Sequence, residues 1–147
     1  MKIGIISDTH GVLREEIIEL LRDCEAIIHA GDIGDENILK ELNLLAPVYA
    51  VKGNNDKEDW AKVLPERLVI ILEDYKIFII HDIKECNGSK EYDIVISGHS
   101  HKLKVAEESK QLSINPGSCG KKRFNLPLTL VKLDLGKEKQ MSIHYLA

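Results

Sequence analysis

Short apolar runs alternate with amphipathic segments in the first fifty residues. The runs are rich in Ile and Val and predict strands at residues 2–7, 26–30 and 47–51. Residues 12–22 and 35–45 instead place apolar side chains at helical spacing, and Asp35 is a suitable N-cap for the second helix. This β-α-β-α-β order is typical of a parallel sheet with helices packed against it.

The second half of the chain has a strand-rich pattern. Polar turns such as Glu73-Asp74 and Gly136-Lys137-Glu138 separate apolar stretches, and apolar and polar residues alternate over 131–135. The predicted strands cover residues 67–72, 76–81, 93–97, 103–107, 111–114, 127–134 and 140–146. With no repeat or linker, we expect a single domain over residues 1–147.

Bulk properties exclude several classes of protein. The longest apolar runs are far shorter than the roughly 20 residues that span a bilayer, and the N-terminal residues lack a signal-peptide pattern. We therefore expect a cytoplasmic protein that does not bind membranes. The net charge of −4 gives no general attraction to nucleic acid. Cys24, Cys86 and Cys119 are odd in number and widely spaced, which disfavours a disulfide framework or a zinc ribbon.

Candidate ligands follow the predicted strands at the point where each strand ends. Five fragments share this position: Asp8-Thr9-His10, Gly31-Asp32, Gly53-Asn54-Asn55-Asp56, His81 and Gly98-His99-Ser100-His101. Because ligands bind beyond the carboxyl ends of parallel strands, we expect the five loops to meet at one rim. Each fragment alone has an ordinary explanation as a turn, a helix cap or a loop histidine. Jointly they predict a metal site.

The residue types indicate the kind of metal chemistry. Carboxylate, imidazole and amide ligands suit borderline and hard divalent ions, and the lack of thiolate argues against a closed structural zinc site. Asp32 lies between the other fragments, and its two oxygens could bridge two ions. Two ions ~3.5–4 Å apart can generate a hydroxide and hold both sides of an in-line phosphoryl displacement.

The order Asp-x-His, Gly-Asp, Gly-Asn-x-Asp, strand-ending His and Gly-His-x-His resembles the calcineurin-like metallophosphoesterase superfamily. Together with the short chain, the segment Asn115-Pro116-Gly117-Ser118 is most similar to its small bacterial and archaeal phosphodiesterase branch. The resemblance implies an α/β fold, a four-layer αββα sandwich of two mixed β-sheets flanked by helices.

The resemblance also implies roles for individual residues. A first divalent ion would be held by Asp8, His10, Asp32 and His101, and a second by Asp32, Asn54, His81 and His99. Asp32 would bridge them together with a hydroxide that attacks phosphorus. Catalytic roles are thereby implied for Asp32, Asn54, Asn55, Asp56 and His99, with Asp56 orienting its neighbours by hydrogen bonds. Mn²⁺ is the expected ion, while Ni²⁺, Fe²⁺, Co²⁺ and Zn²⁺ accept the same ligands.

Two positions depart from the family pattern. Asn55 stands where many members carry a His that protonates the leaving oxygen, a contribution of about 10²–10⁴-fold that an amide does not make. Asp82 stands where Gly is common. An extra carboxylate near the metals would repel a phosphate dianion more than a monoanionic diester, unless Asp82 points to solvent.

The leading hypothesis is therefore a metal-dependent phosphodiesterase that acts on a small substrate. The alternative is a metal-binding but catalytically weak interaction scaffold, like the retromer subunit that resembles this family. A nucleic-acid polymer is disfavoured, because the charge balance is acidic and no clear basic track is present. Lys121-Lys122-Arg123 could bind phosphate or nucleic acid, but a solvated loop is the preferred interpretation. His29 is interpreted as a core or rim histidine. A homodimer is suggested by the resemblance alone.

Overall fold

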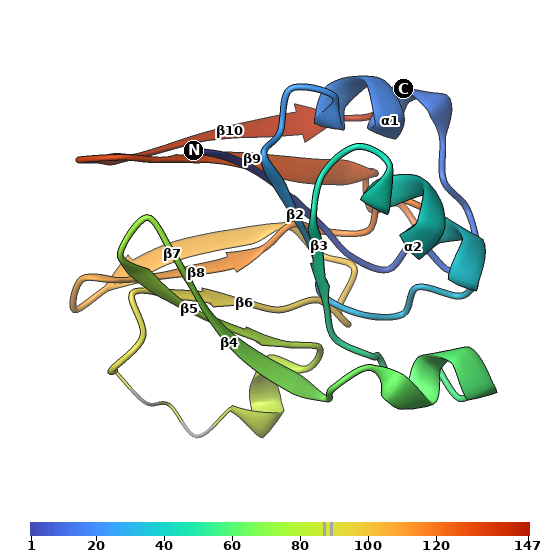
Figure 1. Ribbon diagram of the computed structural model, residues 1–147, viewed down its shortest axis with the longest axis horizontal. Helices are drawn as coiled ribbons and strands as arrows, with labels where there is room; N and C mark the ends of the chain where they lie inside the picture. The colour runs from blue at the N-terminus through green and yellow to red at the C-terminus, as the bar shows by residue number, and fades with distance from the viewer. Residues whose placement is uncertain (87, 89) are drawn as a thin grey trace.

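Two mixed five-stranded sheets pack face to face in the computed structural model, which describes residues 1–86, 88 and 90–147 (Figure 1). The first sheet has the strand order β10-β9-β1-β2-β3, and the second has the order β4-β5-β6-β8-β7. The strands of the first sheet are β1 (Lys2–Ile6), β2 (Ala26–His29), β3 (Val48–Ala50), β9 (Thr129–Leu135) and β10 (Lys139–Tyr145). Those of the second are β4 (Arg67–Leu72), β5 (Tyr75–Ile80), β6 (Ile94–Ile96), β7 (Lys104–Glu108) and β8 (Gln111–Asn115).

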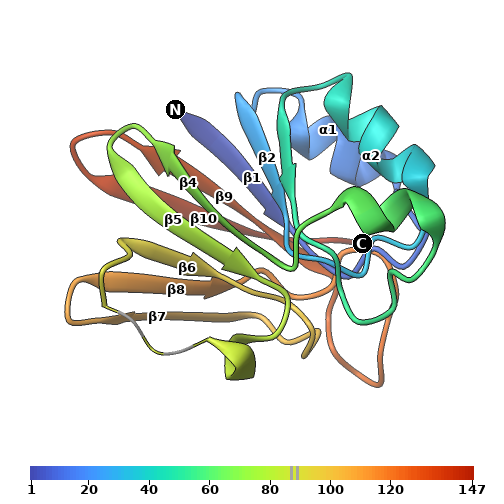
Figure 2. The same ribbon diagram turned by 60° about the horizontal axis from the view of Figure 1, so that its bottom comes forward.

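Both predicted helices lie on the outer side of the first sheet (Figure 2). The second, α2 (Glu36–Asn43), begins after Asp35, whose carboxylate accepts from Asn37 N at 3.0 Å, so the predicted N-cap is confirmed. The first, α1 (Glu15–Leu21), starts three residues later than predicted. Residues 10–12 form loop hydrogen bonds to Thr9, Asp32 and Ile33 instead, which keeps them out of the helix.

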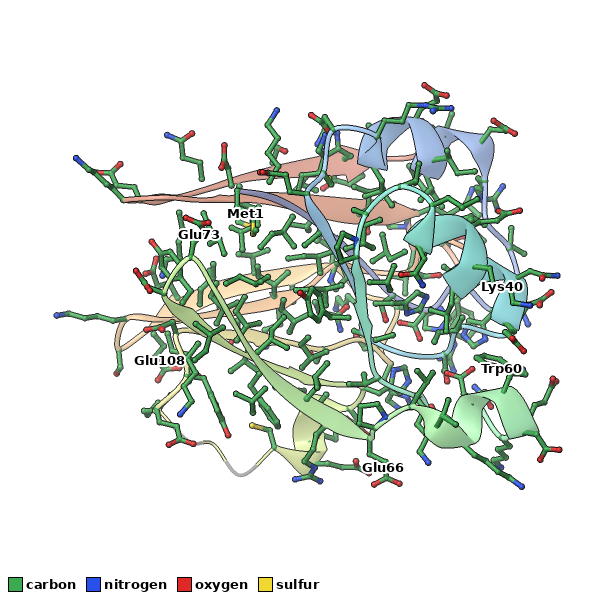
Figure 3. All side chains as sticks on the ribbon, viewed as in Figure 1. Met1, Lys40, Trp60, Glu66, Glu73 and Glu108 are labelled. Atoms are coloured by element: carbon green, nitrogen blue, oxygen red, sulfur yellow. The ribbon has the colours of Figure 1, made fainter. Side chains whose placement is uncertain are left out.

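Two apolar clusters hold the layers together. Alternate residues of each strand face opposite sides of a sheet, so Ile5 of β1 faces the second sheet and Ile6 faces the helices. Ile28, Ile79 and Ile96 share the cluster between the sheets and are fully buried. Figure 3 shows charged residues such as Glu73 and Glu108 at the periphery.

The fold class is confirmed as α/β with two mixed sheets. The cover of the second sheet is thinner than the first sheet's. In the described part of the chain, its outer face carries the short 3₁₀ helix η2 (Ile83–Glu85), beside which Cys86 and Tyr92 pack on buried residues of β5 and β6. Another 3₁₀ helix, η1 (Asp59–Val63), follows β3 and was not predicted.

Cys24, Cys86 and Cys119 are free thiols. Among the described residues, no helix has the length and apolar character needed to cross a bilayer.

The carboxyl ends of two sets of parallel strands meet at one edge of the molecule. Strands β1, β2 and β3 are parallel in the first sheet, as are β5, β6 and β8 in the second. Backbone hydrogen bonds join the loops that follow: Asp8 N donates to Gly31 O at 3.0 Å, and Gly98 N donates to His81 O at 2.9 Å. All five candidate fragments are therefore gathered at this edge.

Ile79 offers a test of the core between the sheets. Its side chain is 0% exposed, so Ile79→Ala leaves a cavity and should lower the free energy of unfolding by about 2–5 kcal/mol in urea titrations. Ile71 on neighbouring β4 is 68% exposed, so Ile71→Ala is the matched control and should change stability by at most about 0.5 kcal/mol. Equal effects of the two substitutions would contradict this account of the core.

Candidate metal centre

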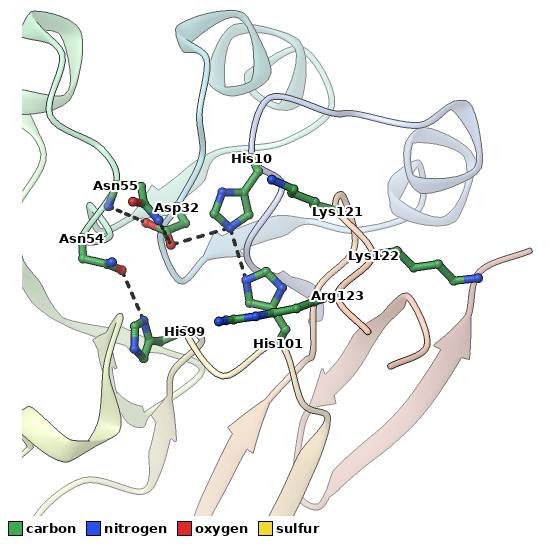
Figure 4. A pocket seen from close by; sticks show the side chains of 9 residues that line it. All are labelled: His10, Asp32, Asn54, Asn55, His99, His101, Lys121, Lys122 and Arg123. Carbon is green, nitrogen blue, oxygen red and sulfur yellow. Dashed lines mark hydrogen bonds and ion pairs between the residues drawn. The ribbon is translucent and has the colours of Figure 1, made fainter. Parts of the chain in front are cut away.

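The structure brings the seven predicted ligands together in two adjacent groups. Asp8, His10 and His101 form the first group, and Asp32, His81 and His99 form the second. Within each group the potential ligand atoms all lie within 4.8 Å of one another. Asn54 joins the second group, because its Oδ1 lies 3.1 Å from His81 Nε2 and 3.2 Å from His99 Nδ1. Figure 4 shows five of these seven side chains around one cavity.

One oxygen of Asp8 is anchored while the other faces the first group. Asp8 Oδ2 accepts from Ser7 Oγ at 2.7 Å and from His99 N at 3.1 Å. Asp8 Oδ1 has no hydrogen-bond partner and is buried, 3.5 Å from His101 Nε2 and 3.8 Å from His10 Nε2. Burial raises the pKa of Asp8, against the opposing effects of Ser7 and the imidazoles. Buried polar atoms are rarely left unpaired, and a divalent cation would satisfy this oxygen.

The orientation of His81 also suits a metal ligand. His81 Nδ1 lies 2.7 Å from Ala30 O, and because a carbonyl only accepts, Nδ1 carries the proton. Nε2 then faces Asp32 Oδ2 at 3.2 Å and Asn54 Oδ1 at 3.1 Å. Burial would lower the pKa of His81, but its bonds to Asp32 and Ala30 outweigh burial and raise it. A proton therefore competes with a metal ion for Nε2.

Asp32 lies between the two groups. Its Oδ2 is 3.2 Å from His81 Nε2 in the second group and 3.7 Å from His10 Nε2 in the first. Asn55 N and Asn55 Nδ2 donate to its two oxygens at 2.9 and 3.1 Å. Burial would raise the pKa of Asp32, but hydrogen bonds from His81 and Asn55 keep it below its usual range. Asp32 is thus an ionised carboxylate that lies between the two groups of potential ligands.

The backbone is strained at this edge of the sheets. Five of the seven candidate ligands have a positive φ: Asp8, His10, Asp32, His99 and His101. Such conformations cost of order 1–3 kcal/mol each and persist only where the surroundings enforce them. Gly53 is required for a related reason, because a Cβ there would lie 2.3 Å from Asp32 N. No sequence pattern predicted this strain.

Asp56 and Asn55 act on other residues of the site. Asp56 is buried and accepts hydrogen bonds from Ile33 N, Gly34 N and Gly53 N at 2.9–3.1 Å. These bonds go to backbone N–H groups of two ligand loops and hold the loops together, so Asp56 is a positioning residue. Asn55 borders the cavity, and its amide Nδ2 donates a hydrogen bond to Asp32 Oδ2 at 3.1 Å.

Asp82 neither joins the metal ligands nor points freely to solvent. Its Oδ1 accepts from Lys84 N at 3.1 Å at the start of η2. Its Oδ2 lies 3.9 Å from His99 Nε2. The extra carboxylate thus sits at the edge of the site beside His99.

His29 has the structural role that was predicted for it. It is fully buried, and burial lowers its pKa to about 3. Gly31 N donates to its Nδ1 at 3.1 Å, so Nε2 carries the proton. Nε2 donates a hydrogen bond to Thr9 Oγ1 at 2.9 Å. Thr9 in turn donates to Ile33 O. Sequence analysis missed this chain of bonds, since nothing in the pattern pairs Thr9 with His29.

The loop between β8 and β9 approaches the site beside Asp8, His10 and His101. Ser118 Oγ lies 3.0 Å from Asp8 O, to which it donates, and Asn115 Nδ2 donates to Gly98 O at 2.9 Å. Lys121, Lys122 and Arg123 are exposed, as predicted, yet they border the cavity above the ligands. The interpretation as a merely solvated loop therefore needs correction. The segment 115–118, singled out by its resemblance, was the available signal.

The family follows from comparison with known proteins. Residues 1–138 match the model of the calcineurin-like phosphoesterase superfamily domain. The chain belongs to this superfamily. It is 36% identical to a phosphodiesterase of Methanocaldococcus jannaschii, covering 97% of this chain and 98% of that one. It is 33% identical to a probable metallophosphoesterase of Methanothermobacter thermautotrophicus, covering 89% and 84%. The predicted enzyme class, a phosphoester hydrolase, is confirmed.

Solved structures agree with this metallophosphoesterase fold. A structure described as a novel archaeal phosphodiesterase superposes with a TM-score of 0.79 at 32% identity, covering 98% of this chain and all of the other. A single mutant of Vps29 from Entamoeba histolytica superposes with a TM-score of 0.80 at 20% identity, covering both chains fully. At that identity the Vps29 likeness concerns the fold alone.

Metal titration tests the arrangement of the metallophosphoesterase ligands. Calorimetry on metal-stripped protein with Mn²⁺ should show two ions per chain. Each site should stabilise the fold by about 2.7 kcal/mol at a free-ion concentration about 100 times its Kd. Asp32→Ala should weaken both sites because Asp32 contacts both groups, whereas His101→Ala should weaken one.

His144 is the matched control for His101, because it lies on the edge strand β10, separated from β1 by β9, and its described hydrogen bond is to Ser142. His144→Ala should leave both affinities unchanged. Two sites of unaltered affinity in Asp32→Ala would contradict the bridging position.

Proposed function

We propose that this metallophosphoesterase hydrolyses small phosphodiesters at a centre of two divalent metal ions. The observation that carries the proposal is the position of Asp32, one ionised carboxylate between two groups of imidazole, carboxylate and amide donors. Bound divalent ions lower the pKa of water and neutralise charge on phosphate oxygens, which is the chemistry that phosphoester hydrolysis needs.

The residues around the ions would bind the cations, admit the phosphate group and position Asp32. Asp8 and Asp32 supply negative charge to hold cations, and their fixed hydrogen bonds keep the donor atoms in place without reorganisation. His99 is only partly buried and borders the cavity of about 380 Å³, so a phosphate group can reach this end of the site from solvent. Asn55 positions Asp32.

A diester is favoured over a monoester by two features. Asp82 places an additional carboxylate near His99, which disfavours a dianion more than a monoanion. Asn55 has no proton to give to a leaving alkoxide, so the leaving group must depart without that help or take its proton from water. Relatives at 32% and 36% identity described as phosphodiesterases support the same choice.

Finer features of the proposal come from ligand chemistry and the family. Mn²⁺ is the proposed ion, with Ni²⁺, Fe²⁺, Co²⁺ or Zn²⁺ as alternatives for the same donors. A small diester, rather than a membrane or a nucleic-acid polymer, is the proposed partner. The cytoplasmic location, the homodimer and the single domain stay predictions. A metal-binding scaffold of the same fold is the competing hypothesis, prompted by the likeness to Vps29.

Hydrolysis of bis-p-nitrophenyl phosphate and p-nitrophenyl phosphate tests the function directly. Metal-stripped protein reloaded with Mn²⁺, Ni²⁺ or Zn²⁺ should hydrolyse the diester faster than the monoester. Asp8→Ala and His99→Ala should each lose at least about 100-fold in kcat/KM, as expected when charge stabilisation in the transition state is removed. Tight binding of two ions without turnover by any metal form would favour the scaffold instead.

Replacement of Asn55 tests the missing general acid. Asn55→His should raise kcat for diesters with alkyl leaving groups, by at least about 10-fold if the imidazole regains part of the usual contribution. Turnover of p-nitrophenyl esters should change little, because that leaving group needs no proton. Asn55→Ala separates the two effects, since it removes the bond to Asp32 without adding an acid. An unchanged dependence on leaving-group pKa in Asn55→His would contradict the hypothesis.

A further inference from the structure

Opposite charges flank the two sides of the metal centre. The cavity of about 380 Å³ on the side of His10 and His101 is also bordered by Lys121, Lys122 and Arg123. A second cavity of about 260 Å³ lies on the other side of Asn54 and His99. Its charged residues, beyond the histidines, are Lys52, Glu66, Asp82 and Glu85. Beyond the histidines, the first side therefore carries three positive charges against the one negative charge of Asp32, and the second carries three negative charges against one positive.

The basic side is held firmly against the ligand loops. Ser118 Oγ lies 2.8 Å from Lys121 O and 3.0 Å from Asp8 O and donates to these carbonyls. Arg14 donates to Gly120 O at 2.9 Å from the segment before α1. Gly120 packs so closely that a Cβ there would lie 2.0 Å from Thr9 O. Residues 116–120 are buried, and residues 121–125 are exposed. The basic side chains of residues 121–123 therefore follow directly after a buried segment that is held in place.

Two of the three basic side chains are directed at the site. In Figure 4, Arg123 extends across His101 into the cavity, and the end of Lys121 approaches His10, whereas Lys122 points away. Among the described residues, no carboxylate forms an ion pair with Lys121 or Arg123. Their charges are therefore available to an anion in the cavity. A guanidinium group suits phosphate in particular, because its N–H groups match two phosphate oxygens at once.

A phosphodiester carries one negative charge, which the metal centre would accept. Lys121 and Arg123 lie beside that centre, so they can hold a different anionic group of the same molecule. The cavity volume falls within the range of about 300–1,000 Å³ typical of small-molecule sites. A polymer that continued into the second cavity would place phosphates against Glu66, Asp82 and Glu85. The charge asymmetry thus favours a small molecule with its extra anion on one side.

We propose that Lys121 and Arg123 form an anion subsite, and that the preferred substrate is a small phosphodiester with a second phosphate on the half that lies over this loop. The inference rests on the proposed function, whose substrate class it specifies. The acidic side would accept the half of the substrate that is neutral or positively charged.

A matched pair of substrates tests the subsite. Thymidine 3′-phosphate 5′-(p-nitrophenyl phosphate) and thymidine 5′-(p-nitrophenyl phosphate) share the leaving group and differ by one phosphate. The Mn²⁺-loaded enzyme should prefer the first by about 10-fold or more in kcat/KM, mainly through KM, and the preference should shrink at high salt. Lys121→Ala and Arg123→Ala should each remove most of the preference while leaving turnover of bis-p-nitrophenyl phosphate within about 2-fold.

Lys137→Ala is the charge-matched control. Lys137 is exposed in the β9–β10 turn, at the opposite end of the first sheet from the site, where Leu135 N donates to Met1 O. This variant should keep the full preference. Equal kcat/KM for the two thymidine substrates, or an unchanged preference in the Lys121 and Arg123 variants, would overturn the subsite and leave the proposed function intact. Faster hydrolysis of a short oligothymidylate than of either substrate would overturn the small-molecule class.

Binding separates failure of the subsite from failure of the function. Calorimetry should show tighter binding of thymidine 3′,5′-bisphosphate than of thymidine 5′-monophosphate, with the difference lost in Arg123→Ala. If that difference appears while no diester is hydrolysed, the subsite stands and the proposed function falls. If neither binding nor turnover distinguishes the paired molecules, the subsite is refuted.

Discussion

The hydrogen bonds around Asp8 connect the two sheets and the β8–β9 loop at the site. Asp8 N donates to Gly31 O across the first sheet, and His99 N donates to the Asp8 carboxylate from the second sheet. Ser118 of the β8–β9 loop donates to Asp8 O. One residue at the end of β1 therefore joins both sheets and the basic loop. Because these bonds occupy Oδ2 and the backbone, the remaining oxygen, Oδ1, is held facing the imidazoles.

This arrangement costs stability that other parts of the fold supply. A buried carboxylate with an unpaired oxygen and several ligands at positive φ are each unfavourable in isolation. The cluster between the sheets, which includes Ile28, Ile79 and Ile96, is fully buried and offsets the cost. The separation is spatial, since the apolar contacts fill the space between the layers while the strained residues lie at their common edge. Such division is expected where a rigid scaffold positions a reactive site.

The fold and the site carry different information about function. The likeness to Vps29 extends over the whole chain, yet at 20% identity it describes the architecture alone. The donor groups, by contrast, combine carboxylates, imidazoles and an amide in two clusters, each of which could hold a metal ion. Function resides in such sites and less in the fold that carries them. The charged residues of the two cavities would influence which substrate binds, because they face groups of the substrate other than the reacting phosphorus.

The sequence by itself determined the element order, the N-cap at Asp35, the turn at Glu73-Asp74 and the family, because periodicity, capping and motif spacing are local properties. Their local nature also explains the misplaced start of α1, where loop hydrogen bonds from residues 10–12 override helical spacing. Only the tertiary structure decided that Asn55 binds Asp32, that Asp82 lies beside His99, and that Lys121 and Arg123 border the metal centre. These contacts join residues far apart in the chain, such as Asn55 with Asp32 and Ser118 with Asp8. They depend on how the two sheets and their loops pack, which no local pattern encodes.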